Sequence, residues 1–188
     1  EGRLSLGQVL RPAVLSGSRP ELLLEHIEKI LVYHRGQVGT PAPHALVLRE
    51  YLRKGEITRE GKVVKPFPAF GPSSMLPIGA ERRYFVRDGK VECHHSYWPE
   101  EAIYGVQGVS EADWKERLRL FNSEDDEEIE YLTALTERFG QCLTGYWSSD
   151  FMFGSRKDDA PRWYFIDAAL GDCSQHWDCP YATTDRQY

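Results

Sequence analysis

Two strand-like runs near the C-terminus constrain the fold more than any other part of the sequence. TGYWSSDFMF (144–153) and RWYFIDAAL (162–170) are rich in aromatic and apolar residues, and the polar run GSRKDDAP separates them. This pattern predicts two antiparallel strands joined in a β-hairpin. With a loop over 156–161, Ser155 lies opposite Arg162.

The register of this hairpin brings two carboxylates together. Counting back from the loop places Asp150 directly opposite Asp167, and directly opposed residues point to the same face of a sheet. Like charges with Cβ atoms about 5 Å apart repel each other. Both aspartates stand among large apolar residues, so water screens them only in part. We therefore expect a cation between them, unless the register slips or one Asp merely ends its strand. Mg²⁺ is the natural candidate, because it commonly uses one or two protein carboxylates and completes its shell with water and substrate phosphates.

A second hairpin is predicted in the run ERRYFVRDGKV. Asp-Gly is favoured in two-residue hairpin turns because both positions need positive φ, so Asp88-Gly89 is the expected turn. The strands are expected over 81–87 and 90–97.

The first strand of this hairpin starts with three charges, although charged residues are not typical of strands. Because side chains alternate along a strand, Glu81 and Arg83 share one face and Arg82 takes the other. Taken alone, Glu81 and Arg83 form a surface ion pair worth less than about 1 kcal/mol. Arg83, the two aspartates and Glu50, which comes just after a run of buried aliphatic residues, are together the ingredients of a metal-nucleotide site. The arginine would hold phosphate, the carboxylates magnesium, and the Glu50 backbone an adenine edge. His94 and His95, in the second strand, are either half-buried strand surface or general bases lining an acceptor pocket.

Local signals predict the remaining elements. They are a helix at 20–35, a buried strand at 44–52, an extended excursion or flexible flap at 53–79, a helix capped by Ser110, and a helix capped by Ser123 that buries Ile129, Leu132, Leu135 and Phe139 and stops at Gly140. The acidic run 124–130 is a possible cation site, but carboxylates in the first turn of a helix are stabilised by its positive end, which favours a structural role. The mixture predicts an α+β domain with a mainly antiparallel sheet flanked by helices.

The net charge of the chain argues against some classes of binding partner. A net charge of -6 argues against a general nucleic-acid or anionic-membrane surface, because phosphate affinity comes largely from clustered Lys and Arg. The apolar stretches are far shorter than the ~18 residues of a membrane span, and the N-terminus lacks the apolar run of a signal peptide. These features predict a cytoplasmic protein without a membrane partner. The chain opens EGRLSLGQVL without an initiator Met, so we expect it to be part of something longer.

The four cysteines form no CxxC pair and suggest no secreted disulfide framework, so we predict reduced thiols. Cys173, His176 and Cys179 offer a zinc site as the alternative, because both residue types ligate zinc at close spacing. The remaining ligand would have to come from far away in the chain.

Four motifs in order along the chain resemble the C-terminal part of an ATP-grasp protein. They are LVLREYL, PIGAERRYFVRDGKVECHHSYWPEEAI, GYWSSDFMF and WYFIDAALGDCSQHWDCP. The similarity is closest to the bacterial and phage ATP-grasp group that is related to the eukaryotic cell-division-cycle assembly factor of translation initiation. It covers residues 20–180, and the joint order of the motifs carries it.

The resemblance implies one ATP-grasp-like region over 1–188. Residues 1–45 would be a remnant of the preceding lobe with one helix, and 46–188 would be the lobe that binds nucleotide and metal. The strand 46–52 would be the family's hinge. Its backbone at Glu50, Tyr51 and Leu52 would bind the adenine edge of ATP, with Arg49 beside it.

The resemblance also assigns the charged residues. Glu81-Arg82-Arg83 matches the family's Glu-x-Arg, which makes Arg83 the catalytic phosphate ligand and Glu81 its orienting partner. Asp150 and Asp167 match the two metal-binding acids. ATP and Mg²⁺ are the implied cofactors.

Two departures from the family pattern stand out. Asp167-Ala168-Ala169-Leu170 replaces the Glu-x-Asn-Pro of many ATP-grasp enzymes, so the Asn ligand is missing and Asp172 is a substitute candidate. The family's phosphate-binding lysines on the N-terminal lobe have no counterpart in 1–45 except Lys29, inside the predicted helix. We therefore expect the lobe that carries them to precede Glu1.

Three functions follow as expectations. The resemblance implies an ATP-dependent ligase that activates a carboxylate through an acyl phosphate for an unidentified acceptor, which could be a small molecule, a peptide or a protein. The first alternative is a non-catalytic, ATP-dependent binding or assembly factor. The second is an interaction domain without nucleotide, in which Asp150→Asn or Asp167→Asn would stabilise the fold by relieving repulsion.

Overall fold

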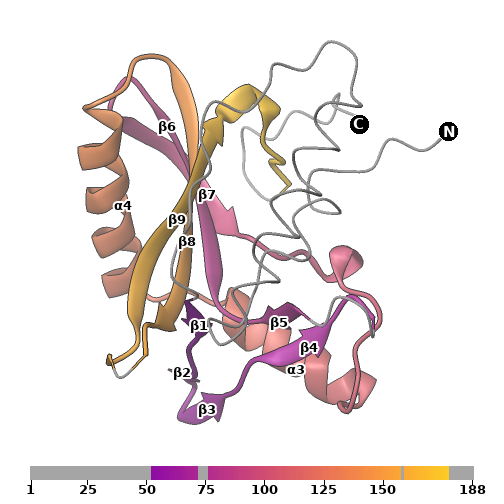
Figure 1. Cartoon of the computed structure of the whole chain (residues 1–188). Coiled ribbons are helices and arrows are strands. Elements are labelled where there is room, and N and C mark those ends of the chain that lie inside the picture. Colours follow the sequence, from indigo (N-terminus) through magenta and orange to yellow (C-terminus); the bar gives the residue numbers. More distant parts are fainter. Residues whose placement is uncertain (1–51, 72–75, 158, 178–188) are drawn as a thin grey trace, which may run out of the picture. The chain divides into compact units, whose positions relative to one another are not determined.

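An antiparallel sheet dominates the computed structural model, which describes residues 52–71, 76–157 and 159–177 (Figure 1). Its five strands are β1 (Arg53–Lys54), β6 (Glu81–Arg87), β7 (Lys90–Ser96), β8 (Tyr146–Ser155) and β9 (Arg162–Leu170). β8 is central: β6 and then β1 pair with one of its edges, and β9 pairs with the other. The predicted α+β class with a mainly antiparallel sheet is confirmed.

Several predicted elements lie outside the described residues. These are the helix at 20–35 and the hinge strand as far as Tyr51, including Arg49 and Glu50. Leu52 is described; it is half-buried and belongs to no strand. None of the helices in the described ranges has the length and apolar composition of a membrane span.

The hairpin of β6 and β7 is confirmed. Asp88 and Gly89 both have positive φ, 48° and 81°, as the two central residues of a type I′ turn require. β7 ends at Ser96, one residue before the predicted limit.

The hairpin of β8 and β9 is confirmed with a corrected register near its loop. Arg162 pairs with Gly154 and not with Ser155, so the predicted pairing at the loop was wrong by one residue. The register then shifts between Asp150 and Phe151, a β-bulge that adds one residue to β9. This shift restores the predicted pairing of Asp150 with Asp167.

Two helices follow the first hairpin. Ser110 caps α3 (Glu111–Asn122) as predicted, because its side chain accepts a hydrogen bond from the backbone of the first turn. The cap of α4 (Asp126–Gly140) is Asp125, so the prediction of Ser123 was wrong. Ser123 is the C-cap residue of α3, and its hydroxyl donates back into that helix.

α4 covers one face of the sheet (Figure 1). Leu132 packs there against Tyr84 of β6 and Phe151 of β8. The fully buried positions of the helix recur every four residues, at Glu128, Leu132, Thr136 and Gly140. The predicted apolar stripe shares only Leu132 with them, since Ile129, Leu135 and Phe139 are half-buried on its flanks.

Gly140 lets the end of α4 approach the first hairpin. A Cβ atom at this position would lie 2.6 Å from Cγ2 of Val86 and 3.1 Å from Cα of Gly89. Both distances are shorter than or close to the limit of ordinary packing. The close approach of two backbones therefore explains the glycine.

The segment 53–79 is packed in its described part, so its interpretation as an excursion or flap was wrong. β2 (Ile57–Arg59) pairs with β3 (Lys62–Val64), and β4 (Phe67–Ala69) pairs with β5 (Leu76–Ile78). Their inward side chains form a hydrophobic core with α3: Ile57, Val64, Phe67, Ala69, Ile78, Leu118, Leu120 and Phe121.

These strands escape pattern recognition because each has three residues, too few to display a period of two. One local signal was present in Glu60-Gly61. Both residues have positive φ, 52° and 72°, and they form the two-residue turn between β2 and β3.

Gly140→Ala is expected to lower the free energy of unfolding by about 1–3 kcal/mol, because the added methyl overpacks the contact with the hairpin. In a Val86→Ala background the same change should cost less, since Cγ2 is gone. Urea denaturation of the four proteins of this double-mutant cycle measures the difference. Equal or higher stability of Gly140→Ala in the wild-type background would contradict the close-approach interpretation.

Candidate functional site

Five charged side chains gather on the sheet face opposite α4. We call this surface the Arg83 face and define it by Lys54, Glu81, Arg83, Asp150 and Asp167. Arg83 pairs in register with Asp150, and Asp150 with Asp167, across β6, β8 and β9. Lys54 ends β1 and contacts Glu81 at the start of β6. The structure therefore brings together Glu81, Arg83 and the two aspartates as the sequence predicts, and adds Lys54.

The centre of this face is a two-pronged ion pair. Arg83 Nε donates to Asp150 Oδ1 and Arg83 Nη2 to Asp150 Oδ2, both at 2.7 Å. The third nitrogen, Nη1, donates to the backbone carbonyl of Gln175 at 3.2 Å. The guanidinium also stacks over Tyr97, 4.7 Å from its ring centre. Arg83 is thus the cation that Asp150 contacts.

Asp150 and Asp167 are paired across β8 and β9, but their exposure to solvent differs. Asp150 is 5% exposed, whereas Asp167 is exposed and accepts a hydrogen bond from the backbone of Ala168. Burial raises the pKa of Asp150; the hydrogen bonds and charge of Arg83 oppose this, and the charge of Asp167 adds to it. The predicted repulsion between the two carboxylates is present, and Arg83 offsets it on one side only.

Glu81 has partners other than Arg83. Its Oε1 accepts a hydrogen bond from Trp98 Nε1 at 2.6 Å and contacts Lys54 Nζ. Both the carboxylate and the ammonium are largely buried. Glu81 therefore holds Lys54 at the edge of the face.

Lys54 is a site residue that sequence reasoning missed. It stands in the Gly-, Pro- and Lys-rich segment that lacked periodicity, and only its pairing through β1 places it here. Burial lowers the pKa of its ammonium to about 7, while the contact with the Glu81 carboxylate favours the charged form.

Arg82 points to the α4 side, where it is fully buried. Its Nε lies 2.6 Å from Glu128 and 2.8 Å from Glu124, and its other nitrogens donate to the carbonyls of Glu81, Phe121 and Ser123. Burial raises the pKa of Glu128, against the charges of Arg82 and Arg59. These contacts join β6 to the α3–α4 junction, so these two members of the acidic run have structural partners.

The two histidines of β7 point to opposite faces. His94 stacks on Tyr84 with ring centres 4.7 Å apart and lies 3.2 Å from Glu124, on the α4 side. His95 is buried on the other side, opposite Arg83 in register. The two rings therefore cannot act together on one acceptor.

Cys93 corrects the prediction of reduced thiols, because it is disulfide-bonded. Cys142 and Cys173 are free and exposed. His176, one of the three ligands of the zinc alternative, has its Nε2 2.9 Å from Cys93 Sγ and its ring stacked on Phe85. This side chain helps to cover the sheet near Arg83.

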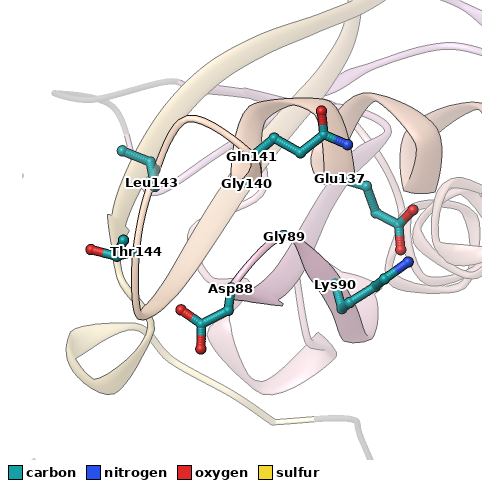
Figure 2. Close-up of a pocket in the computed structure, with 8 residues that line it drawn as sticks. All are labelled: Asp88, Gly89, Lys90, Glu137, Gly140, Gln141, Leu143 and Thr144. Atoms are coloured by element: carbon teal, nitrogen blue, oxygen red, sulfur yellow. The ribbon is translucent and has the colours of Figure 1, made fainter.

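A polar cavity of about 430 Å³ lies at the other end of the hairpin, where Asp88-Gly89 meets the end of α4 (Figure 2). Its residues are Asp88, Gly89, Lys90, Glu137, Gly140, Gln141, Leu143 and Thr144. The backbone N–H of Gly145 donates to the Asp88 carboxylate at 2.7 Å, so this group stabilises the turn. The residues of the Arg83 face do not line this cavity.

No family model, curated protein or solved structure matches this chain. The ATP-grasp resemblance consequently stays a prediction, and the function has to be argued from the Arg83 face itself.

The donor set of this face suits Mg²⁺. Asp150 and Asp167 supply carboxylate oxygens from opposed positions, and Mg²⁺ often takes only one or two such ligands. Within the ranges that the structure describes, no three His, Cys, Asp or Glu side chains gather into a metal cluster. Water and a bound phosphate would therefore complete the shell. Arg83 competes with a metal for Asp150, because its guanidinium already donates to both carboxylate oxygens.

Asp150→Asn is expected to lower the free energy of unfolding by up to about 3 kcal/mol, because it leaves the buried Arg83 without its counter-charge. Asp167→Asn, which removes the same charge from an exposed position, should change it by less than about 0.5 kcal/mol. Urea denaturation without metal compares the two. An Asp150→Asn protein as stable as wild type would show that the ion pair contributes nothing, and a more stable one would restore the repulsion argument.

The pKa of Lys54 generates a pH prediction. Between pH 7 and the ordinary lysine pKa of 10.5, the unfolded chain binds a proton that the folded chain releases, so Lys54 makes stability rise with pH. The stability of Lys54→Met relative to wild type should therefore fall across this range, at a rate approaching about 1.4 kcal/mol per pH unit. Urea denaturation at a series of pH values measures it. A constant difference would mean that Lys54 keeps its ordinary pKa.

Proposed function

We propose that the Arg83 face binds the phosphate groups of a magnesium nucleotide, with ATP as the nucleotide that the ATP-grasp resemblance implies. One observation carries the proposal. Two cations and two carboxylates, from β1, β6 and the hairpin of β8 and β9, lie on one face of the sheet. Separate cationic and oxygen-donor groups are what phosphate and magnesium require.

Each residue has a role in the proposal. Arg83 binds phosphate with its planar fork, and Lys54, held by Glu81, supplies a second cation on the same face. Asp150 and Asp167 bind the metal. Magnesium held there would neutralise phosphate charge and orient the transferred group.

The adenine part of the proposal rests on the resemblance. It assigns the adenine edge to the backbone of Glu50, Tyr51 and Leu52, with Arg49 beside it. Leu52 precedes β1, and β1 ends at Lys54 on the Arg83 face.

The reaction proposed is ligation through an acyl phosphate. Such chemistry depends on positioning and charge stabilisation and needs no protein nucleophile. The Arg83 face offers charged groups of this kind. The acceptor could be a small molecule, a peptide or a protein, and the same site without turnover would serve an ATP-dependent binding or assembly factor.

The ion pairs favour one other candidate, an interaction domain without nucleotide. Arg83 and Asp150 already neutralise each other, and Arg82 is fully satisfied by Glu128 and backbone carbonyls. Under this alternative the Arg83 face is a structural surface, and its charges serve stability alone.

Thermal melts of the full-length protein with and without Mg-ATP separate the candidates. A ligand at a hundredfold excess over its dissociation constant stabilises the native state by about 2.7 kcal/mol. Wild type should show a rise in Tm, and Arg83→Ala and Asp167→Asn should not. Arg87→Ala is the matched control, because Arg87 lies on the same face of β6 but pairs with Glu92.

An unchanged Tm of wild type would refute the nucleotide site and leave the interaction domain. A rise that persists in Arg83→Ala would place the nucleotide elsewhere. If the site stands, ADP or AMP release that depends on an added acceptor supports the ligase. ATP-dependent capture of a partner without turnover supports the assembly factor.

A further inference from the structure

We infer that metal and phosphate bind to the Arg83 face interdependently, because each must take its ligand out of the same ion pair. The inference rests on the proposed function and concerns its regulation. In the ligand-free protein, Arg83, which would bind phosphate, and Asp150, which would bind metal, form an ion pair with each other. The site is therefore closed by its own residues until both ligands arrive.

The strongest polar contacts of both side chains are already made within the protein. Two nitrogens of the Arg83 guanidinium face the two oxygens of Asp150, and the third faces the Gln175 carbonyl. The side chains are 13% and 7% exposed. A phosphate arriving alone competes with a carboxylate already in bidentate contact. A metal arriving alone competes with a guanidinium on the same oxygens.

Removing one partner leaves the other charge buried and alone, which is unfavourable. When phosphate takes Arg83 while metal takes Asp150, neither charge loses its counter-charge. Binding of one ligand thus prepares the site for the other, and by linkage the coupling is the same in both directions.

The neighbours of the pair suit such an exchange. Tyr97 stacks on the guanidinium, so Arg83 keeps a contact on its flat face when its hydrogen bonds change. Asp167 is exposed and stands opposite Asp150, where a metal can reach it before the pair opens. Its charge also acts against the ionised form of Asp150.

The test measures the phosphate ligand and the metal ligand separately, each with one probe that only it should bind. Asp150→Asn removes a proposed metal ligand, yet it should tighten the binding of inorganic pyrophosphate in EDTA by at least about fivefold, the lower end of usual coupling factors. Asp167→Asn is the control, since it removes the same charge without freeing Arg83. Isothermal titration calorimetry measures the dissociation constants, on proteins whose circular dichroism is native.

The second arm is independent of the stability of Asp150→Asn. Arg83→Gln should tighten the binding of Mn²⁺ alone by a similar factor, because Asp150 loses its competitor. Arg87→Gln removes the same charge from the same face of β6 and should leave Mn²⁺ binding within about twofold of wild type, as expected for a surface pair. Electron paramagnetic resonance counts the free Mn²⁺.

The outcomes separate this inference from the proposed function. If wild type binds Mg-ATP but neither Asp150→Asn nor Arg83→Gln gains affinity for its single probe, the coupling is refuted and the site stands. Equal gains in the control variants would also refute it, because general electrostatics would then suffice. If no protein binds Mg-ATP, pyrophosphate or Mn²⁺, both ideas fail together.

Discussion

The buried, charged start of β6 is the constraint on which the rest of the structure depends. Three consecutive charges enter the middle of a sheet, where an unpaired charge is costly. Each one obtains a counter-charge from a different part of the chain: Lys54 of β1 for Glu81, Glu128 of α4 for Arg82, and Asp150 of β8 for Arg83. The sheet, the α3–α4 junction and the short strand β1 therefore have to assemble around this point.

Strand alternation turns this constraint into two different faces. The even-numbered side of β6 carries Arg82 and Tyr84 beneath α4. There Arg82 donates hydrogen bonds to backbone carbonyls as well as to carboxylates. The odd-numbered side carries Glu81 and Arg83, whose charged partners are the side chains of Lys54 and Asp150. The α4 side therefore has more backbone partners, whereas the proposed ligand site lies on the other.

The Arg83 face combines two descriptions that compete at first sight. Its central ion pair has the geometry of a structural salt bridge, and its residues have the composition of a phosphate and magnesium site. The interdependent site that we propose would reconcile them, because the same pair that neutralises the face without ligand would divide between metal and phosphate when both are bound. The exposed Asp167 and the stacked Tyr97 are the groups that would allow this change.

The sequence by itself predicted the features that depend only on neighbouring residues. The Asp88-Gly89 turn, the Ser110 cap and the facing of Asp150 and Asp167 all follow from backbone preferences, capping and alternation, although a bulge had to correct the register of β9. Tertiary structure decided the rest. It buried the three-residue strands of 57–78 against α3 and supplied Asp150 and Lys54 as partners of Arg83 and Glu81. These choices depend on contacts between residues far apart in the chain, and no local pattern encodes which buried charge meets which.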